Sequence, residues 1–222
     1  MTEIVIGNEF KRRLNDISSE FFSMSPNKEK YWSFNDSDTS MTDGEYYCSD
    51  EALEKKLSKG KDHEGFPEEY LAQPISKMVE EDPEIWMHFR NKVKFDFAKE
   101  IGAHSSALLS YYPPGGHVGW HTNWNANAYQ VLFTYSKTGD GYFRYLDKVT
   151  DKIVTIQDVK GWQCRHYYFG RVEEENSHCW HSAYAGGERL TLAYKFSNKS
   201  LMDDQNEKAI MMRDLAIEEI ME

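Results

Sequence analysis

The sequence Leu109-Ser-Tyr-Tyr-Pro-Pro-Gly-Gly-His-Val-Gly-Trp-His-Thr-Asn123 opens the region that decides the fold, and Cys179-Trp-His-Ser-Ala-Tyr-Ala-Gly-Gly-Glu-Arg-Leu-Thr-Leu-Ala-Tyr-Lys-Phe196 closes it. Between them, turn sequences such as Thr-Gly-Asp-Gly separate short runs in which apolar and polar residues alternate. A period of two predicts β-strands. The predicted strands cover residues 107–112, 117–121, 129–135, 142–146, 153–157, 162–169, 179–184 and 190–196. So many short strands in about ninety residues indicate a sandwich or jelly roll, and not alternating βαβ units.

Helical patterns flank this β region on both sides. Phe10, Leu14, Ile17 and Phe21 recur at helical spacing, and Asp82-Pro-Glu is a typical helix start. The predicted helices cover residues 8–22, 67–79, 82–101 and 203–221, and a short apolar run predicts a strand in residues 3–7. We therefore expect a mainly β chain of the α+β class. Its expected parts are a helical N-terminal region in residues 1–104, a β core in 105–197 and a C-terminal helix in 198–222.

The segment 23–65 is polar and rich in Asp, Ser, Thr and Gly, with a charged run at 51–64. It is predicted to be a loop with one short helix over residues 50–58. Long loops of this kind often act as lids or specificity elements.

Composition and charge narrow the class of protein. The net charge is −11, yet residues 105–197 hold nine Lys or Arg against eight Asp or Glu, so that the flanks carry the whole excess. An acidic total disfavours non-specific nucleic-acid binding. The three cysteines have no metal-type spacing and cannot all pair, and no apolar run predicts a membrane span or a signal peptide. We expect a cytoplasmic protein; the oligomeric state is not indicated.

The chemistry-bearing residues gather at the two ends of the β region. His121 and Asn123 stand two residues apart, so their side chains point the same way at a strand end, and His181 follows sixty residues later. Non-haem iron(II) sites use two histidines and usually one carboxylate on one face of the metal. The spacing predicts a metal held by His121, Asn123 and His181. His178 competes with His181 for the distal position, and His117 is a candidate for a supporting residue or a substrate contact.

With these motifs, residues 108–196 resemble the iron(II)- and 2-oxoglutarate-dependent oxygenases, in particular their prolyl-4-hydroxylase-like branch. The lead-in Tyr112-Pro-Pro-Gly-Gly before Trp120-His121 and the later Trp180-His181 followed by Arg189 carry the resemblance. It implies a double-stranded β-helix, a jelly-roll or cupin-like fold, with flanking helices. It does not extend to residues 1–100.

The resemblance also implies an activity. Iron(II) would bind His121, Asn123 and His181, and 2-oxoglutarate would place its distal carboxylate on Arg189, Thr191 and Tyr112, because a guanidinium fork and a hydroxyl suit that group. The alternative for Arg189 is a structural salt bridge to Glu188 or another acid. The expected reaction is hydroxylation of a C–H bond in a small-molecule or peptide substrate.

The family has a carboxylate where this chain has Asn123, and a neutral amide binds iron(II) more weakly. Asn123 would then ligate through its oxygen, leave the position to water or another anion, or mark a barrel that has lost catalysis. The competing functions are a non-catalytic binding or structural module with the same fold, and a cupin-like metal protein that uses no 2-oxoglutarate.

Overall fold

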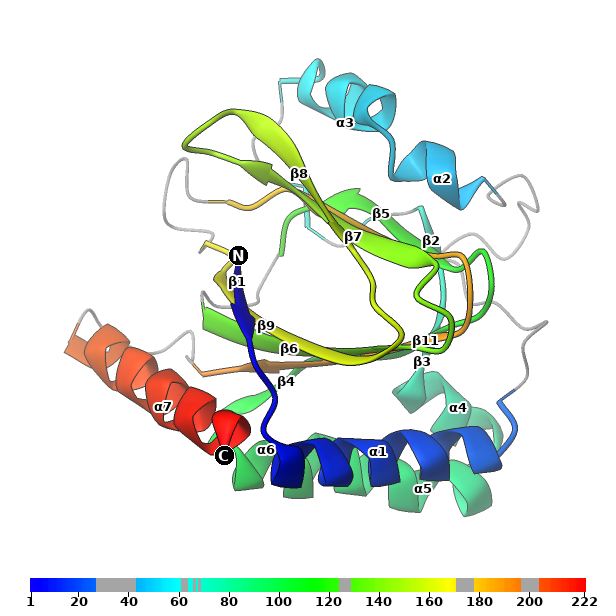
Figure 1. Cartoon of the computed structure of the whole chain (residues 1–222). Helices are drawn as coiled ribbons and strands as arrows, with labels where there is room; N and C mark the ends of the chain where they lie inside the picture. The colour runs from blue at the N-terminus through cyan, green and yellow to red at the C-terminus, as the bar shows by residue number, and fades with distance from the viewer. Residues whose placement is uncertain are drawn as a thin grey trace.

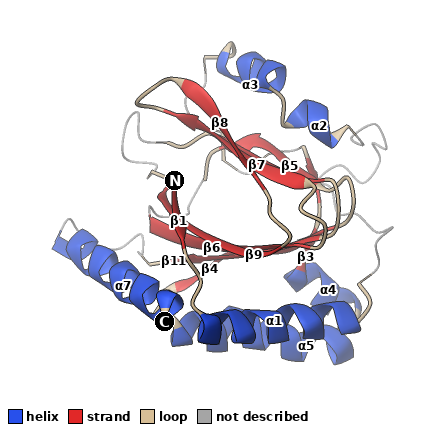
Figure 2. Cartoon of the chain, in the orientation of Figure 1, coloured by secondary structure: helices blue, strands red, loops and turns tan. Residues whose placement is uncertain are grey.

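Two antiparallel sheets face each other and carry helices on their outer sides (Figures 1 and 2). The structure, a computed structural model, describes residues 1–26, 43–60, 64–65, 67, 69–123, 129–170, 178–196 and 204–222. The core strands are β4 (Ser105–Tyr112), β5 (His117–His121), β6 (Tyr129–Ser136), β7 (Gly141–Asp147), β8 (Lys152–Gln157), β9 (Gly161–Tyr168), β10 (His181–Ala185) and β11 (Arg189–Lys195). Three short strands, β1 (Thr2–Ile4), β2 (Tyr70–Leu71) and β3 (Gln73–Pro74), extend the sheet edges.

The strand order is that of a double-stranded β-helix. One sheet has the order β1-β9-β6-β11-β4-β3 and the other β2-β5-β10-β7-β8. Except for the β7–β8 hairpin, each step along the chain from β4 to β11 crosses from one sheet to the other. The predicted fold is therefore confirmed, and each predicted core strand agrees with the observed one to within two residues at both ends.

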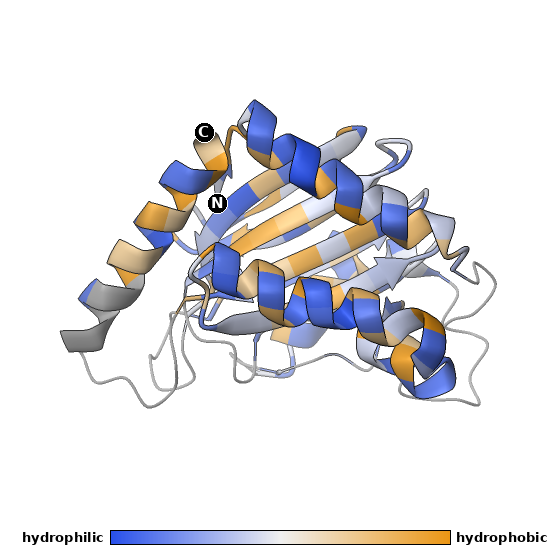
Figure 3. Ribbon diagram, turned by 90° about the horizontal axis from the view of Figure 1, so that it is seen from below, coloured by the Kyte–Doolittle hydropathy of each residue, from blue (hydrophilic) through white to orange (hydrophobic). Residues whose placement is uncertain are grey.

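The six-stranded sheet is covered by most of the helices. They are α1 (Asn8–Ser23), α4 (Ile75–Glu81), α5 (Pro83–Asn91), the π-helix η1 (Lys92–Asp96), α6 (Phe97–Glu100) and α7 (Asp204–Met221). Seen from the helix side, hydrophobic strands lie between helices whose outer surfaces are largely hydrophilic (Figure 3). Two further helices, α2 (Gly44–Tyr47) and α3 (Asp50–Leu57), lie outside the five-stranded sheet. No helix in the described ranges is long and apolar enough to cross a bilayer.

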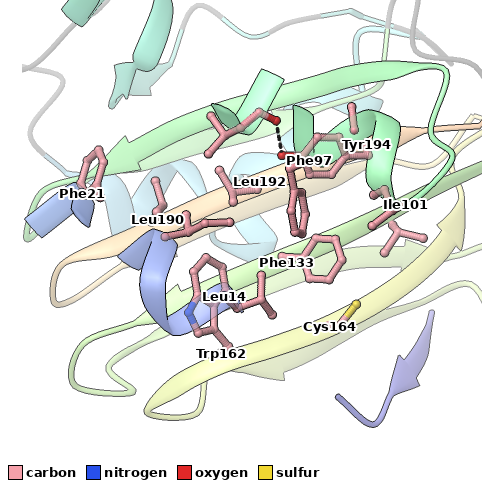
Figure 4. Packing of buried hydrophobic residues seen from close by; sticks show 14 of the residues in the cluster. Leu14, Phe21, Phe97, Ile101, Phe133, Trp162, Cys164, Leu190, Leu192 and Tyr194 are labelled. Atoms are coloured by element: carbon pink, nitrogen blue, oxygen red, sulfur yellow. Dashed lines mark hydrogen bonds between the residues drawn. The ribbon is translucent and has the colours of Figure 1, made fainter. Parts of the chain in front are cut away.

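The main hydrophobic core lies between the helices and the outer face of the six-stranded sheet (Figure 4). Leu14 and Phe21 of α1 pack there with Phe133 of β6, and all three are fully buried. Each such side chain contributes about 1.5–3 kcal/mol when it leaves water. The Tyr194 hydroxyl donates to the Val93 carbonyl of η1 at 2.6 Å, which ties the π-helix to β11.

Strand β11 shows how one sequence period serves both the core and the site. Leu190, Leu192 and Tyr194 belong to the core under the helices, whereas Arg189 and Thr191 line the space between the two sheets. Successive side chains of a strand point to opposite faces. The packing of the helices therefore fixes the strand whose other face carries the polar groups.

Two helix predictions need correction. The helix predicted over residues 67–79 begins only at Ile75, because Tyr70–Leu71 pairs with β5 and Gln73–Pro74 pairs with β4. The helix predicted over 82–101 has the expected extent and Asp82 cap, but η1 interrupts it.

In the predicted 23–65 loop, α3 matches the expected short helix and α2 is an additional turn of helix. Residues 27–42 and 61–63 of that loop lie outside the described ranges.

Candidate functional site

A cavity of about 100 Å³ lies between the two sheets, and the six predicted site residues all line it. They are Tyr112, His121, Asn123, His181, Arg189 and Thr191. Apolar side chains, among them Leu132 and Phe143, form much of the remaining wall. Two stretches that are far apart in sequence therefore meet around one space, with the histidines and Arg189 as its most polar features.

The register of β5 and β10 brings the two histidines together. His121 ends β5, His181 begins β10, and the two residues are paired across the sheet with ring centroids 4.1 Å apart. A bulge shifts the register between His181 and Ala183, so that Val118 and His121, three residues apart, both reach the cavity. His178 precedes the strand and does not line this cavity, so His181 is the residue opposite His121.

Backbone carbonyls orient both rings. Nδ1 of His121 lies 2.9 Å from the Gly119 oxygen, and Nδ1 of His181 lies 2.8 Å from the Cys179 oxygen. A carbonyl only accepts hydrogen bonds, so each Nδ1 carries a proton, and in the neutral ring the lone pair is on Nε2. This is the usual way in which a protein orients a metal-binding imidazole. The His121 ring also interacts with the backbone of His181.

Burial also keeps the two rings neutral. It lowers the pKa of His181 to about 4, and burial together with the nearby His181 lowers the pKa of His121 well below its usual value. Phe143 and Phe169 pack against His181, with ring centroids at 5.6 and 4.8 Å. A neutral imidazole is the form that binds a divalent transition metal, so this half of the site fits such an ion.

Asn123 follows the end of β5 and lines the same cavity, partly exposed. It offers an amide oxygen and no charge. Within the described residues, no cluster of three or more His, Cys, Asp or Glu side chains is arranged to hold a metal ion. The available donor set is therefore two imidazoles and one amide.

At the other end of the cavity Arg189 is already paired. Its Nε donates to Asp158 Oδ2 at 2.9 Å and its Nη1 to Thr191 Oγ1 at 2.9 Å, and its Cζ lies 5.4 Å from the centre of the Tyr112 ring. The side chains of Arg189 and Asp158 are 3% and 1% exposed. Gln163 Nε2 donates to Asp158 Oδ1 at 2.6 Å. The guanidinium is thus neutralised by a fully buried carboxylate.

The sequence-based alternative of a salt bridge from Arg189 is therefore observed, with Asp158 as the acid. Glu188, the neighbour considered first, instead accepts from Tyr111 at 3.1 Å and Lys137 at 2.6 Å. Sequence reasoning did not single out Asp158. It stands in the turn between β8 and β9, where an aspartate is ordinary, so no local signal distinguishes it.

His117 lies away from the cavity. Its ring stacks on Tyr47 of α2 with centroids 5.7 Å apart, and its Nδ1 lies 3.2 Å from the Gly115 oxygen. Neither of these contacts involves His121, Asn123 or His181, and so neither supports a role for His117 at the metal position. Trp120 of the same strand packs with Leu53 of α3 on the outer side of the sheet.

The segment before β2 is held beside the histidines. Thr122 Oγ1 accepts from the backbone N–H groups of Glu64 and Gly65 at 3.1 and 3.3 Å. Lys56, 7% exposed, forms ion pairs with Glu64 and Glu69. These contacts fix residues 64–65 next to the end of β5.

Comparison with known proteins gives limited guidance. No protein-family model matches the chain, and no curated protein does. A prolyl-4-hydroxylase structure from Pseudomonas putida aligns over 80% of this chain and 97% of its own, with 12% identity and a TM-score of 0.33. An oxalate oxidase structure aligns over 51% of this chain and 62% of its own, with 12% identity and a TM-score of 0.29. A second, in complex with glycolate, aligns over 52% and 62% with the same identity and TM-score.

This chain thus spans less than two thirds of the oxalate oxidase chains that it matches. Similarity at this level carries no argument about activity. The strand order shows a double-stranded β-helix, the fold of cupins and 2-oxoglutarate-dependent oxygenases.

Proposed function

We propose that this protein is an iron(II)-dependent oxygenase that uses a 2-oxo acid, 2-oxoglutarate in the sequence-based prediction, to hydroxylate a C–H bond of a small molecule or peptide. One observation carries the proposal. His121 and His181, both neutral and both oriented through Nδ1, face each other in a cavity that Asn123 also lines. A buried pair of imidazoles with oriented Nε2 lone pairs suits a divalent transition metal.

Each group of residues has a proposed task. His121 and His181 hold the metal, and Asn123 either offers its amide oxygen or leaves that position to water or another anion. Phe143 and Phe169 exclude water from the His181 side. Tyr112, Arg189 and Thr191 line the far end, where the 2-oxo acid would extend. The bound metal and co-substrate supply the oxygen chemistry, and the barrel supplies orientation.

The atoms of this reaction balance. One oxygen atom of O₂ enters the substrate hydroxyl, and the other enters the carboxylate that remains after the 2-oxo acid loses CO₂. The 2-oxo acid supplies two electrons and the substrate C–H bond supplies two. The proposal therefore requires no further reductant.

The first test measures metal binding in the absence of turnover. Anaerobic titration of the metal-free protein with iron(II) should show one site in the wild type, and His181→Ala should lose it. His178→Ala is the matched control, because His178 is a buried histidine of the same segment outside the cavity, and it should bind like wild type. Equal iron binding by His181→Ala and wild type, or none by wild type, would overturn the proposal.

A second function has a specific observation in its favour. Asn123 lacks the charge of the usual ligand, and Arg189 is neutralised by Asp158. Both features fit a double-stranded β-helix that binds a ligand without catalysis. Aerobic release of CO₂ from a 2-oxo acid by the iron-loaded protein distinguishes the two, because a binding module releases none.

A further inference from the structure

Arg189, at the far end of the cavity, has a fixed counter-ion in the space that adjoins the cavity. Asp158 accepts from Arg189 Nε and from Gln163 Nε2, and its backbone N–H donates to the Gly141 oxygen at 2.8 Å. A Cβ atom at position 141 would lie 2.6 Å from Asp158 Oδ2. Gly141 therefore leaves the room that this carboxylate occupies. Asp158 lines the space that adjoins the cavity, and Arg189 lines both.

The charges at this end already cancel. Arg189 contributes one positive charge and Asp158 one negative charge, and both side chains are at least 97% buried. A ligand with a second carboxylate would make one guanidinium serve two buried anions. Burying a charge is costly unless an opposite charge compensates it. Among the described residues around this end and the adjoining space, the other cations are Arg165, which pairs with Glu3 at 3.7 Å, and the amino group of Met1, which donates to the Tyr145 hydroxyl at 3.3 Å.

What Arg189 still offers is hydrogen-bond donation. Nε serves Asp158 and Nη1 serves Thr191, and none of the described residues accepts a hydrogen bond from Nη2. Because Arg189 lines the cavity, this donor suits a neutral oxygen such as an amide, carbonyl or hydroxyl. The cavity therefore favours a ligand that is anionic where it meets the metal and uncharged where it meets Arg189.

We propose that the co-substrate of this protein is a 2-oxo acid with an uncharged far end, and that Asp158 discriminates against 2-oxoglutarate. The proposal rests on the proposed oxygenase function and names the class of 2-oxo acid that it uses. The sequence-based prediction is 2-oxoglutarate, with its distal carboxylate on Arg189. Asp158 is the residue that changes this expectation, since without it the guanidinium of Arg189 would suit a distal carboxylate.

A pair of nearly isosteric ligands tests the proposal. The iron(II)-loaded protein is titrated anaerobically with 2-oxoglutarate and with its 5-amide, 2-oxoglutaramate, and binding is followed by the visible charge-transfer absorbance of the complex. The wild type should bind the amide at least tenfold more tightly than 2-oxoglutarate. Asp158→Asn, which keeps the shape and removes the charge, should shift this ratio at least tenfold towards 2-oxoglutarate.

Asp151→Asn is the matched control, because Asp151 lies exposed in the β7–β8 turn, and its ratio should equal that of wild type. Preference of the wild type for 2-oxoglutarate, or the same ratio in Asp158→Asn, overturns the inference while iron binding leaves the oxygenase proposal standing. If Asp158→Asn does not fold, the wild-type ratio alone decides. Failure of iron(II) itself to bind overturns the oxygenase proposal, and this inference falls with it.

Discussion

At the scale of single residues, the identity of residue 123 sets the charge of the metal position. Divalent cations bind anionic oxygen more tightly than a neutral amide. Asn123→Asp is therefore expected to tighten iron(II) binding at least tenfold, about 1.4 kcal/mol. The two side chains have nearly the same size, so the fold should tolerate the change. An anaerobic competition titration with a chromophoric chelator measures the affinity.

The control for added charge is Asn91→Asp, at the end of α5 and remote from the cavity, which should leave the affinity unchanged. Unchanged affinity in Asn123→Asp would show that residue 123 makes no contact with the metal. Slower turnover in a variant that binds more tightly would show that the neutral amide serves the reaction.

The same scale shows which part of the site could be predicted. His121 and His181 could be predicted because the spacing of ligands and the ends of strands can be recognised from neighbouring residues in the sequence. Asp158 could not be found, because it meets Arg189 only through the stacking of β8 and β11 in opposite sheets. Its contacts come from tertiary structure, and one sequence holds no sign of them.

At the scale of elements, the core strands could be predicted from the sequence, but the short strands at the sheet edges could not. Alternating residues between glycine-rich turns predict the eight core strands to within two residues at both ends. Tyr70–Leu71 and Gln73–Pro74 instead take their conformation from the open edges of β5 and β4. Pairing with a neighbour overrode the helical pattern of residues 67–79.

The π-helix η1 gives a prediction at this scale. The Tyr194 hydroxyl donates to the Val93 carbonyl inside the core. Tyr194→Phe leaves that carbonyl without this donor and is expected to cost about 1–3 kcal/mol of unfolding free energy. Urea unfolding followed by circular dichroism measures the loss.

Tyr168→Phe, on β9, serves as the control for removing a tyrosine hydroxyl from a site that is not fully buried. It should cost less than Tyr194→Phe. If Tyr194→Phe is as stable as wild type, the hydroxyl does not hold η1 in place.

At the scale of the whole molecule, the two sheets enclose the cavity, and most of the helices cover the outer face of the six-stranded sheet. Buried imidazoles lie on both sides of the five-stranded sheet: His121 and His181 within the cavity, and His117 against α2. Burial lowers the pKa of all three, that of His181 to about 4. These rings therefore remain neutral in the folded protein at pH values where free histidine gains a proton.

This difference predicts how stability depends on pH. The pKa of histidine in the unfolded chain is about 6.5. Below that pH the unfolded chain binds more protons than the folded protein, so stability is complete above about pH 6.5 and falls as the pH approaches the lower folded values. Between pH 7.5 and 5.5 the metal-free protein should lose on the order of 1 kcal/mol or more of unfolding free energy. Urea midpoints at the two pH values, in the presence of a chelator, measure this loss.

His117→Gln identifies the contribution of the ring outside the cavity. The glutamine does not titrate. The unfolding free energy of the variant should therefore change less between pH 7.5 and 5.5 than that of wild type, whatever the variant's absolute stability. The Gly115 carbonyl, and after it Glu69 and Asp43, oppose the effect of burial on the pKa of His117. The share of His117 should therefore be smaller than that of the two rings in the cavity. Equal wild-type stability at pH 7.5 and 5.5 would mean that the buried rings accept protons as readily as exposed ones. Burial would then not explain why the imidazoles at the metal position are neutral.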